Sequence, residues 1–503
     1  MLEVRKLTIE VAHKKVIENL SFNLNKGDKL AIIGEEGNGK TTLLKAIYDK
    51  SLIDYGEVTG IVDKKNNKIG YLKQTLSVAE LDMKIFEYLY SNMDEYYMSI
   101  GKLYKVLNAI GFNVDVFENR KLNTLSGGEK IKMQFLKLLL GDYDIYFLDE
   151  PTNDLDIDSL IWLQNFIKHT LKPIVYVSHD ELLLEETANM IMHLELIKKK
   201  SVFKYSVCHM KYLEYVENRL HLITKNTSVA LKERQNKKIK EDKLNQIMNK
   251  VDHELNTISR KDPKGAKLLK KKMKSLKSQE KRFEKEEIKE IPEYEKNIMF
   301  TFEKVFIPPS KIVIDFRLDK LNFGEKILSH DIKLLVKGQE KIVILGQNGC
   351  GKTTLIKKIY EQLKNREDIT TFYMPQNYDE IFETYDKPLD FLCETFEKEE
   401  QELYRSYMGN MNFTIYEMNG KINELSGGSK TKLILLKQII SKCNVLILDE
   451  PTRNTSPLSN PIIRKALSSY EGTIISVSHD RKYISEVANK IYYLSEDGLK
   501  YEK

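Results

Sequence analysis

The 503-residue sequence has few cysteines and no long apolar run, and each shortage excludes a class of protein. Four cysteines are too few for a disulfide framework in a chain of this length. No stretch approaches the roughly 18 consecutive apolar residues of a spanning helix, which excludes an integral membrane transporter. The first residues, MLEVRKLTIEVAHKK, lack the apolar core of a secretory signal. We therefore expect a soluble cytoplasmic protein with no membrane partner.

Length and charge indicate several domains with one basic region. A chain of 503 residues is too long for one ordinary core, and the length favours two or three domains. The net charge of +6 is modest, but residues 201–300 hold 25 Lys and Arg against 15 Asp and Glu. The basic character therefore lies in the middle of the chain.

An internal repeat organises the sequence. Four segments return in the same order: GEEGNGKTT (34–42) as GQNGCGKTT (346–354), LSGGE (125–129) as LSGGS (425–429), FLDEPT (147–152) as ILDEPT (447–452), and VSHD (177–180) as VSHD (477–480). Order and spacing repeat together, which indicates two copies of one domain. In each copy an apolar run precedes the glycine-rich loop and helical spacing follows it. Further apolar runs end at polar residues, as buried parallel strands do, so we expect an α/β fold with a ligand site at one sheet edge.

The glycine-rich loops fit the pattern GxxxxGK[ST], which wraps phosphates with backbone N–H groups. The lysines Lys40 and Lys352 would reach the terminal phosphates, and the hydroxyls of Thr41 and Thr353 would bind Mg²⁺. The residues expected to bind the nucleotide here are Gly34, Glu35, Glu36, Gly37, Asn38, Gly39, Lys40, Thr41 and Thr42, and Gly346, Gln347, Asn348, Gly349, Cys350, Gly351, Lys352, Thr353 and Thr354.

Acidic and histidine residues follow the later strands of each copy. Asp149 and Asp449 end apolar strands, where a carboxylate can hold Mg²⁺. The next residues, Glu150 and Glu450, can polarise a water for attack on the γ-phosphate. The histidines that follow the VS dipeptide could contact the γ-phosphate or orient that water, although they could also be structural; they are His179 and His479.

These motifs resemble those of an ATP-binding-cassette (ABC) ATPase with two cassettes in tandem, and LSGGE and LSGGS resemble the signature of that class. The resemblance implies ATP hydrolysis in two head-to-tail sites within one monomer. Ser426, Gly427 and Gly428 would cap ATP held by Lys40. Likewise, Ser126, Gly127 and Gly128 would cap ATP held by Lys352.

The same resemblance assigns three further residues. Gln74 and Gln376 resemble the Q-loop glutamines, which contact Mg²⁺ and the attacking water. Phe323 would stack on adenine in the second cassette, whereas the matching position in the first holds Val11. Cys350 is interpreted as a small tolerated side chain in the second loop rather than a redox switch.

Between the copies, apolar residues recur at helical spacing on both sides of Pro263-Lys264-Gly265. The pattern predicts an antiparallel helical hairpin with a first helix over about 211–259, roughly 70 Å long, and a turn over 259–265. The expected fold class is therefore two tandem P-loop ABC ATPase domains (1–208 and 299–503) joined by a long antiparallel α-helical hairpin linker (209–298). The lysines at its tip, expected to bind RNA, are Lys261, Lys264, Lys267, Lys270, Lys271, Lys272 and Lys274.

The linker and the EPTNDLD/EPTRNTSPLS pair resemble the ABC-F branch of ribosome-acting ATPases, and the short, armless form resembles its antibiotic-resistance members. This resemblance implies binding of the 70S ribosome, ribosomal RNA and transfer RNA at the exit site, with protection against lincosamides, pleuromutilins and streptogramins A. Whether such a short tip displaces drug or repositions transfer RNA stays open. The alternatives are an ABC-F translation factor without a resistance role, an importer ATPase subunit, a DNA-maintenance ATPase, and a linker that is merely solvated.

Overall fold

The computed structural model describes residues 1–12, 14–91, 101, 103, 106, 120–257, 263–285, 305–453 and 455–502. These fall into two compact units, one made of Met1–Leu213 with Lys296–Lys503 and the other of Glu214–Glu295. We call the two copies in the first unit the first and second cassettes, and we call the second unit the helical arm. No helix in the described ranges combines the length and apolar character needed to cross a membrane.

The first cassette is an α/β domain in which strands and helices alternate along the chain. Its strands are β1 (Leu2–Val11), β2 (Lys14–Leu24), β3 (Lys29–Ile33), β4 (Gly56–Asp63), β5 (Ile69–Leu72), β6 (Ile145–Asp149), β7 (Ile174–Val177), β8 (Met190–Leu196) and β9 (Val202–Cys208). Its α-helices are α1 (Lys40–Tyr48), α2 (Val78–Asp82), α3 (Ile85–Tyr90), α5 (Gly127–Leu140), α6 (Ile157–His169), α7 (Glu181–Thr187) and α8 (Ile197–Lys200).

The second cassette repeats much of this order, but its described residues contain no counterpart of β4 or α8. Its strands are β10 (Ile312–Phe323), β11 (Lys326–Lys337), β12 (Lys341–Gly346), β13 (Thr371–Met374), β14 (Val445–Asp449), β15 (Thr473–Val477), β16 (Lys490–Ser495) and β17 (Gly498–Tyr501). Its α-helices are α11 (Lys352–Leu363), α12 (Asp379–Phe382), α13 (Pro388–Leu392), α14 (Lys398–Asn410), α15 (Ile415–Asn419), α16 (Gly427–Ile440), α17 (Asn460–Ser469) and α18 (Arg481–Val487).

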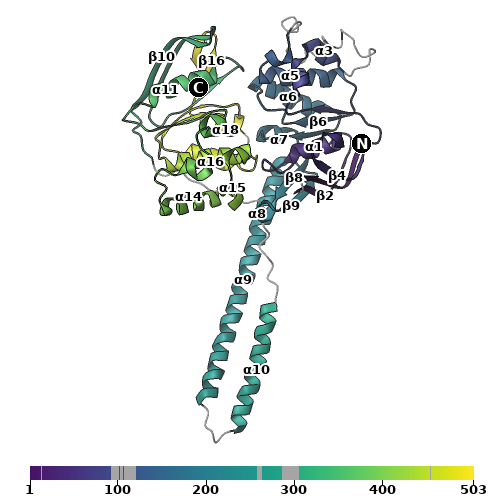
Figure 1. Cartoon of the computed structure of the whole chain (residues 1–503), viewed down its shortest axis with the longest axis vertical. Coiled ribbons are helices and arrows are strands. Elements are labelled where there is room, and N and C mark those ends of the chain that lie inside the picture. Colours follow the sequence, from purple (N-terminus) through teal and green to yellow (C-terminus); the bar gives the residue numbers. More distant parts are fainter. Residues whose placement is uncertain are drawn as a thin grey trace. The chain divides into compact units, whose positions relative to one another are not determined.

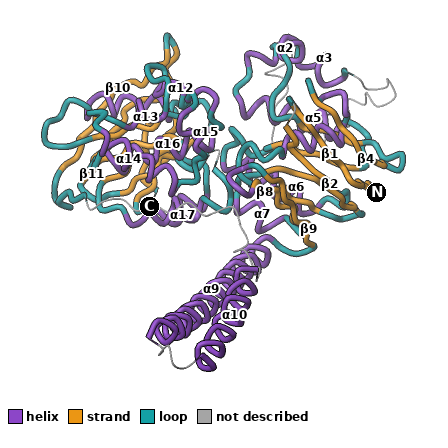
Figure 2. The backbone as a smooth tube through the Cα atoms, turned by 60° about the horizontal axis from the view of Figure 1, so that its bottom comes forward, coloured by secondary structure: helices purple, strands orange, loops and turns teal. Residues whose placement is uncertain are grey.

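The central sheets of the two cassettes have matching strand orders, β5-β6-β7-β3-β8-β9 and β13-β14-β15-β12-β16-β17. The first five strands of each sheet pair in parallel, and the last strand is antiparallel. Helices accompany each sheet in Figure 2. Every residue of β3, β6 and β14 is buried, which explains the apolar runs 30–33, 145–148 and 445–448 within these strands. The predicted α/β fold with parallel strands is confirmed.

The helix that follows each phosphate loop lies between two sheets. Leu43, Leu44 and Ile47 of α1 share one apolar core with the central sheet and with the antiparallel β2-β1-β4 sheet. In the second cassette, Leu355, Ile356 and Ile359 of α11 join β10 and β11 to the central sheet in the same way. Strands β3 and β12 thus deliver their loops to the carboxyl edge of the sheet, and the buried helices fix the loops there.

The described part of the helical arm contains α10 (Pro263–Lys285) and all but the first two residues of α9 (Tyr212–Thr257), and the two helices lie side by side in Figure 1. Leu244 and Val251 of α9 pack against Leu276 of α10 in one small apolar cluster. The predicted turn over 259–265 is wrong at its end, because α10 already begins at Pro263. Proline suits the first turn of a helix, where its missing N–H has no partner to lose.

Candidate functional site

The two glycine-rich loops have the same backbone form. The residues before α1 and α11, Gly39 and Gly351, have φ of 86° and 102°, a left-handed conformation that side chains disfavour. Gly34 needs glycine for a second reason, because a Cβ there would lie 2.3 Å from the Leu194 carbonyl oxygen. The amides of each loop therefore converge at a helix N-terminus, which is an anion-binding arrangement.

The loop lysines are buried and point back over their loops. Lys40 Nζ donates to the carbonyl oxygens of Gly34 at 2.9 Å and Glu35 at 3.0 Å. Lys352 Nζ donates in the same way to Gly346 at 2.8 Å and Gln347 at 2.9 Å. Burial lowers the pKa of Lys352. Each ammonium is thus held beside the N–H groups of its loop, so that a bound phosphate could contact the ammonium and the N–H groups together.

In the first cassette a threonine and a tyrosine hold the strand-end aspartate. Thr41 Oγ1 donates to Asp149 Oδ1 at 2.9 Å, and Tyr71 of β5 donates to Asp149 Oδ2 at 3.0 Å. Burial and the neighbouring Glu150 charge raise the pKa of Asp149 to about 6. The sequence motifs do not predict the role of Tyr71, because β5 is short and nothing in the local sequence connects Tyr71 with Asp149.

The strand-end aspartate of the second cassette fits a divalent cation. Asp449 is 1% exposed and hydrogen-bonds to Thr353, yet its Oδ2 atom has no hydrogen-bond partner. Burial raises the pKa of this carboxyl to about 7. A buried carboxylate oxygen without a partner is costly unless a cation binds it, and hydroxyl and carboxylate oxygens are ligands that Mg²⁺ accepts.

The glutamates after these strands have a constrained backbone in both cassettes. Glu150 and Glu450 have φ of 49° and 56°, and their N–H groups donate to Val177 at 3.1 Å and Val477 at 2.9 Å. A left-handed conformation at a residue other than glycine is unfavourable and persists only when its surroundings impose it. Each carboxylate lies within reach of the charge of its loop lysine, Lys40 for Glu150 and Lys352 for Glu450.

The two glutamates nevertheless have different surroundings. Glu150 Oε2 accepts from Gln74 at 2.9 Å and Asn153 at 2.7 Å, and His179 Nε2 lies 3.6 Å from Glu150 Oε1. Burial alone would raise the pKa of Glu150, but the contacts with His179 and Asn153 and the Lys40 charge hold it at about 2. The structure thus brings together Gln74, Glu150 and His179.

Burial dominates in the second cassette and raises the pKa of Glu450 to about 7. The His479 N–H donates to Glu450 Oε2 at 3.3 Å, and the ring Nε2 lies 3.8 Å from Oε1. Burial, with the Lys352 charge, lowers the pKa of His479 to about 4, so this imidazole is neutral near pH 7. Position 153 of the first cassette is matched by Arg453, whose guanidinium pairs with Asp154 at 3.0 Å, whereas the Asn153 side chain donates to the Glu150 carboxylate. This substitution is one source of the asymmetry.

A cavity of about 610 Å³ joins the second phosphate loop to the first signature segment. The cavity is lined by these residues of the predicted site: Ser126, Gly127, Gly128, His179, Phe323, Asn348, Gly349, Gly351, Lys352, Thr353, Thr354, Gln376, Asp449, Glu450 and His479. Ser126 caps α5 by accepting the Glu129 N–H, and the first turn of that helix lines the cavity through Gly127 and Gly128. Phe323 ends β10 and is 71% exposed at the wall. The second phosphate loop and the first signature segment thus line the same cavity.

Phe323→Ala is expected to weaken ATP binding at the second loop about fivefold, because a stacked ring contributes about 1 kcal/mol. Equilibrium binding of labelled ATP to a Lys40→Ala chain, which keeps only the second loop intact, measures this. Phe323→Tyr is the matched control and should retain affinity. An unchanged dissociation constant for Phe323→Ala would place adenine elsewhere.

At the first loop, the opposite cassette supplies the second signature segment. Glu36 of the loop accepts the backbone N–H of Gly428, and Glu35 Oε2 lies 2.8 Å from Lys432 Nζ of α16. Ser426 caps α16 by accepting the Ser429 N–H at 3.2 Å. The predicted partners, the Lys40 loop and residues 426–428, thus lie together here.

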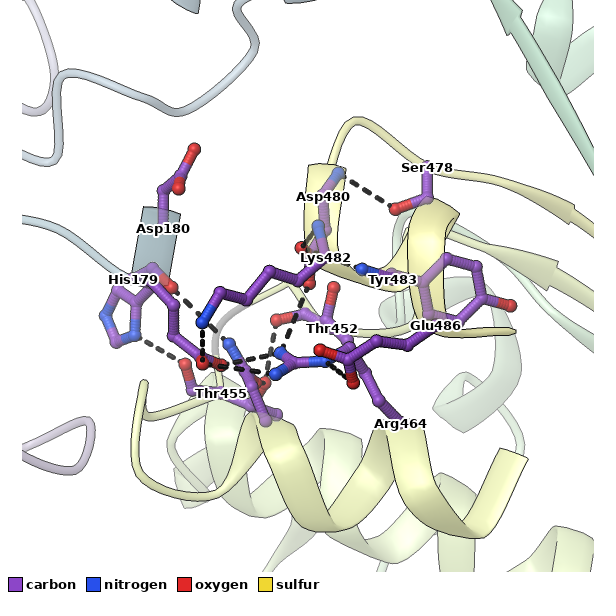
Figure 3. Close-up of polar contacts among 12 residues, drawn as sticks. His179, Asp180, Thr452, Thr455, Arg464, Ser478, Asp480, Lys482, Tyr483 and Glu486 are labelled. Atoms are coloured by element: carbon purple, nitrogen blue, oxygen red, sulfur yellow. Dashed lines mark hydrogen bonds and ion pairs between the residues drawn. The ribbon is translucent and has the colours of Figure 1, made fainter. Parts of the chain in front are cut away.

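An ion-pair network links the cassettes beside the histidine loops (Figure 3). Arg464 of α17 donates to both carboxylate oxygens of Glu181, at 2.6 and 3.1 Å, and to Glu486 at 2.8 Å. His179 Nδ1 lies 2.6 Å from the Thr455 carbonyl oxygen, and Figure 3 shows its ring directed at Thr455. The sequence motifs do not predict this network, because Arg464, Glu181 and Glu486 belong to no phosphate-binding pattern.

The expected RNA-binding lysines lie on α10, except Lys261, which lies outside the described residues. The described ones are exposed: Lys264, Lys267, Lys270, Lys271, Lys272 and Lys274. Leu269, Met273 and Leu276 of the same helix pack toward α9. The lysines therefore occupy the face of α10 that the apolar cluster leaves open.

Comparison with known proteins places these features in a family. The family description "ABC transporter" matches residues 17–153 and 329–453. "ABC transporter F family member 5" of Arabidopsis thaliana is 27% identical over 96% of this chain and 73% of its own length. "Ribosome protection protein VmlR" of Bacillus subtilis is 27% identical over 98% of this chain and 86% of its own length.

Solved structures share the fold. A complex of an archaeal ribosomal stalk protein with the ribosome recycling factor aABCE1 contains a chain that matches with a TM-score of 0.58 and 19% identity, covering 98% of this chain and 89% of that one. A structure titled "RNase-L Inhibitor" gives the same score and coverage. At this identity, the likeness concerns the architecture of the tandem cassettes.

Proposed function

The chain belongs to the ABC transporter family and is an ABC-type ATPase, and from this we propose that it is an ABC-F-like tandem ATPase that binds the ribosome in its ATP-bound form. The observation that carries the proposal is the length of the alignment with one relative. A protein named for ribosome protection aligns over 98% of this chain, which includes the helical arm. If the chain were an importer ATPase subunit or a DNA-maintenance ATPase, its full-length similarity to a ribosome protection protein would have no explanation. The proposal places the protein in the cytoplasm, where ribosomes are.

ATP would bind twice, between each phosphate loop and the signature segment of the other cassette. The N–H groups of the loops and the signature helices would hold the phosphates, with Lys40 or Lys352 at their outer end. Mg²⁺ would be held by Thr41 with Asp149 and by Thr353 with Asp449, and when bound it would neutralise phosphate charge.

Hydrolysis would use the two constrained glutamates. Glu150 and Glu450 would accept a proton from the attacking water. Gln74, which donates to Glu150, and Gln376, which lines the same cavity as Glu450, would orient that water. His179 and His479 lie next to the glutamates and would position the water or the terminal phosphate. Hydrolysis would then let the closed cassettes open and the protein leave the ribosome, so that the rate of ATP hydrolysis sets how long the protein stays bound.

The helical arm would provide the contact with RNA. Its lysines present a row of ammonium groups that suits the phosphate backbone of ribosomal RNA, recognised by shape more than by sequence. We propose that the arm enters the exit site beside transfer RNA and extends toward the peptidyl-transferase centre. Protection against lincosamides, pleuromutilins and streptogramins A is the finer proposal, and an ABC-F translation factor without that role is the alternative.

Co-sedimentation through sucrose with 70S ribosomes tests the partner. The Glu150→Gln, Glu450→Gln double variant should pellet with ribosomes when ATP is present and not without it. Failure to pellet under both conditions would contradict ribosome binding and favour a membrane or nucleoid partner. Expression in a drug-sensitive host distinguishes a resistance protein from a translation factor without that role. A resistance protein should raise the inhibitory concentration of a lincosamide, and the double variant should not.

Changing Lys264, Lys267, Lys270 and Lys271 together to Ala should weaken this ribosome binding strongly and leave ATP binding intact. Loss of each phosphate contact removes roughly 0.7–0.9 from the slope of log affinity against log salt, so pelleting at several salt concentrations measures the effect. The matched control replaces four exposed lysines of the cassettes by Ala: Lys15, Lys65, Lys333 and Lys398. Equal loss in both quadruple variants would contradict a specific role for the arm.

A further inference from the structure

The two phosphate loops differ in charge at the two positions after their first glycine. The first loop carries Glu35 and Glu36, whereas the second carries the amides Gln347 and Asn348. Two carboxylates therefore stand in the loop expected to hold a triphosphate at the first site. Carboxylates and phosphates repel each other at short range, so this loop should bind the nucleotide poorly unless other groups neutralise its carboxylates.

Both carboxylates are engaged by the second cassette. Glu35 Oε2 pairs with Lys432 Nζ at 2.8 Å, and Glu35 Oε1 accepts from Ser459 Oγ at 2.9 Å. Although burial alone would raise the pKa of Glu35, the charge and hydrogen bond of Lys432 hold it below its usual range. Glu35 is thus a fixed anion that ties the first loop to α16 and to the start of α17.

Glu36 makes a different kind of contact. Its Oε2 atom accepts the backbone N–H of Gly428, in the first turn of the 14-residue helix α16. At the second loop the corresponding Asn348 donates its side-chain N–H to the Asp154 carbonyl oxygen instead. The helix N-terminus that would hold an outer phosphate at the first site therefore already holds a carboxylate.

One N–H group cannot donate a full hydrogen bond to both Glu36 and a phosphate oxygen. We propose that Glu36 is an internal competitor for the outer phosphate at the first site, so that this site binds ATP more weakly than the second and favours ATP over ADP less strongly. The inference rests on the proposed assignment of the two ATP sites. It makes position 36 the residue that sets the difference between them.

The test compares one site at a time in the full chain, with labelled ATP or ADP plus Mg²⁺ in equilibrium dialysis. Lys352→Ala leaves the first site intact, and Glu36→Asn is added to copy the second loop. The expected result is ATP binding at least about tenfold tighter, because a like charge near the phosphates is removed, with ADP changed by less than about twofold. Glu36→Gln, which keeps an acceptor oxygen and removes the charge, should act in the same direction.

The reciprocal experiment places the carboxylate in the second loop. Asn348→Glu in a Lys40→Ala chain should weaken ATP binding at least about tenfold. Unchanged ATP affinity in both Glu36→Asn and Asn348→Glu would overturn the proposal. A Lys40→Ala, Lys352→Ala chain that still binds ATP would instead overturn the site assignment, and the inference with it, so the two failures are distinguishable. Circular dichroism of each variant checks that the fold persists.

Discussion

Arg464→Ala is expected to destabilise the paired cassettes by up to about 3–5 kcal/mol, the cost of removing one member of a buried ion pair. The Arg464 and Glu181 side chains are only 2% and 4% exposed, and their contact is bidentate. Removal of the guanidinium leaves the Glu181 carboxylate with Lys482, 3.4 Å away. Thermal unfolding measures the loss of stability, and ATPase activity should fall with it because each site needs both cassettes.

An exposed ion pair is the control for this prediction. Arg317→Ala removes a pair with Asp315 whose side chains are 73% and 51% exposed, and such a pair contributes at most about 1 kcal/mol. The double reversal Glu181→Arg, Arg464→Glu should recover part of the stability that either reversal alone loses. A melting temperature equal to that of the unchanged protein for Arg464→Ala would show that the network does not hold the cassettes together.

The same positions indicate why the cassettes pair with each other. Gln164 corresponds to Arg464 in the repeat, and Glu181 corresponds to Arg481; Arg481 Nη1 donates to Gln164 Oε1 at 2.7 Å. The repeat thus places glutamine opposite arginine in one contact and glutamate opposite arginine in the other. Two second cassettes brought together would instead set Arg464 against Arg481, which like-charge repulsion opposes.

The Glu150→Gln, Glu450→Gln double variant is expected to lose ATP hydrolysis by about 100-fold or more, the usual contribution of a positioned general base. Glutamine keeps the size of the side chain but cannot take the proton of the attacking water. ATP binding should survive, because Lys40, Lys352 and the loop amides are unchanged. Phosphate release under saturating ATP measures hydrolysis, and dialysis with labelled ATP measures binding.

The single variants separate the two sites. Glu150 is held by Gln74 and Asn153, whereas Glu450 receives its hydrogen bond from the His479 N–H, so the two sites should contribute unequally to turnover. Each single variant should therefore leave a different residual rate. Undiminished hydrolysis in the double variant would show that neither glutamate polarises the water.

Much of the fold follows from local patterns. Local sequence is enough to predict the apolar runs 30–33 of β3 and 342–345 of β12, the glycines of the loops and the Lys-Thr pairs that begin α1 and α11, because each depends on neighbours within a few residues. The repeat supplied the second copy by the same signals. The end of the turn at Pro263 was misplaced, because a proline between two helical patterns can either break a helix or begin one.

The sequence by itself determined that the chain has two α/β cassettes, where their phosphate loops lie, and which strand-end acids accompany them. Only the tertiary structure decided which groups meet those residues. Glu36 meets Gly428 across 392 positions, and Arg464 meets Glu181 across 283. Such contacts leave no periodic or local pattern in the sequence, because they depend on how the surfaces of the two cassettes pack against each other.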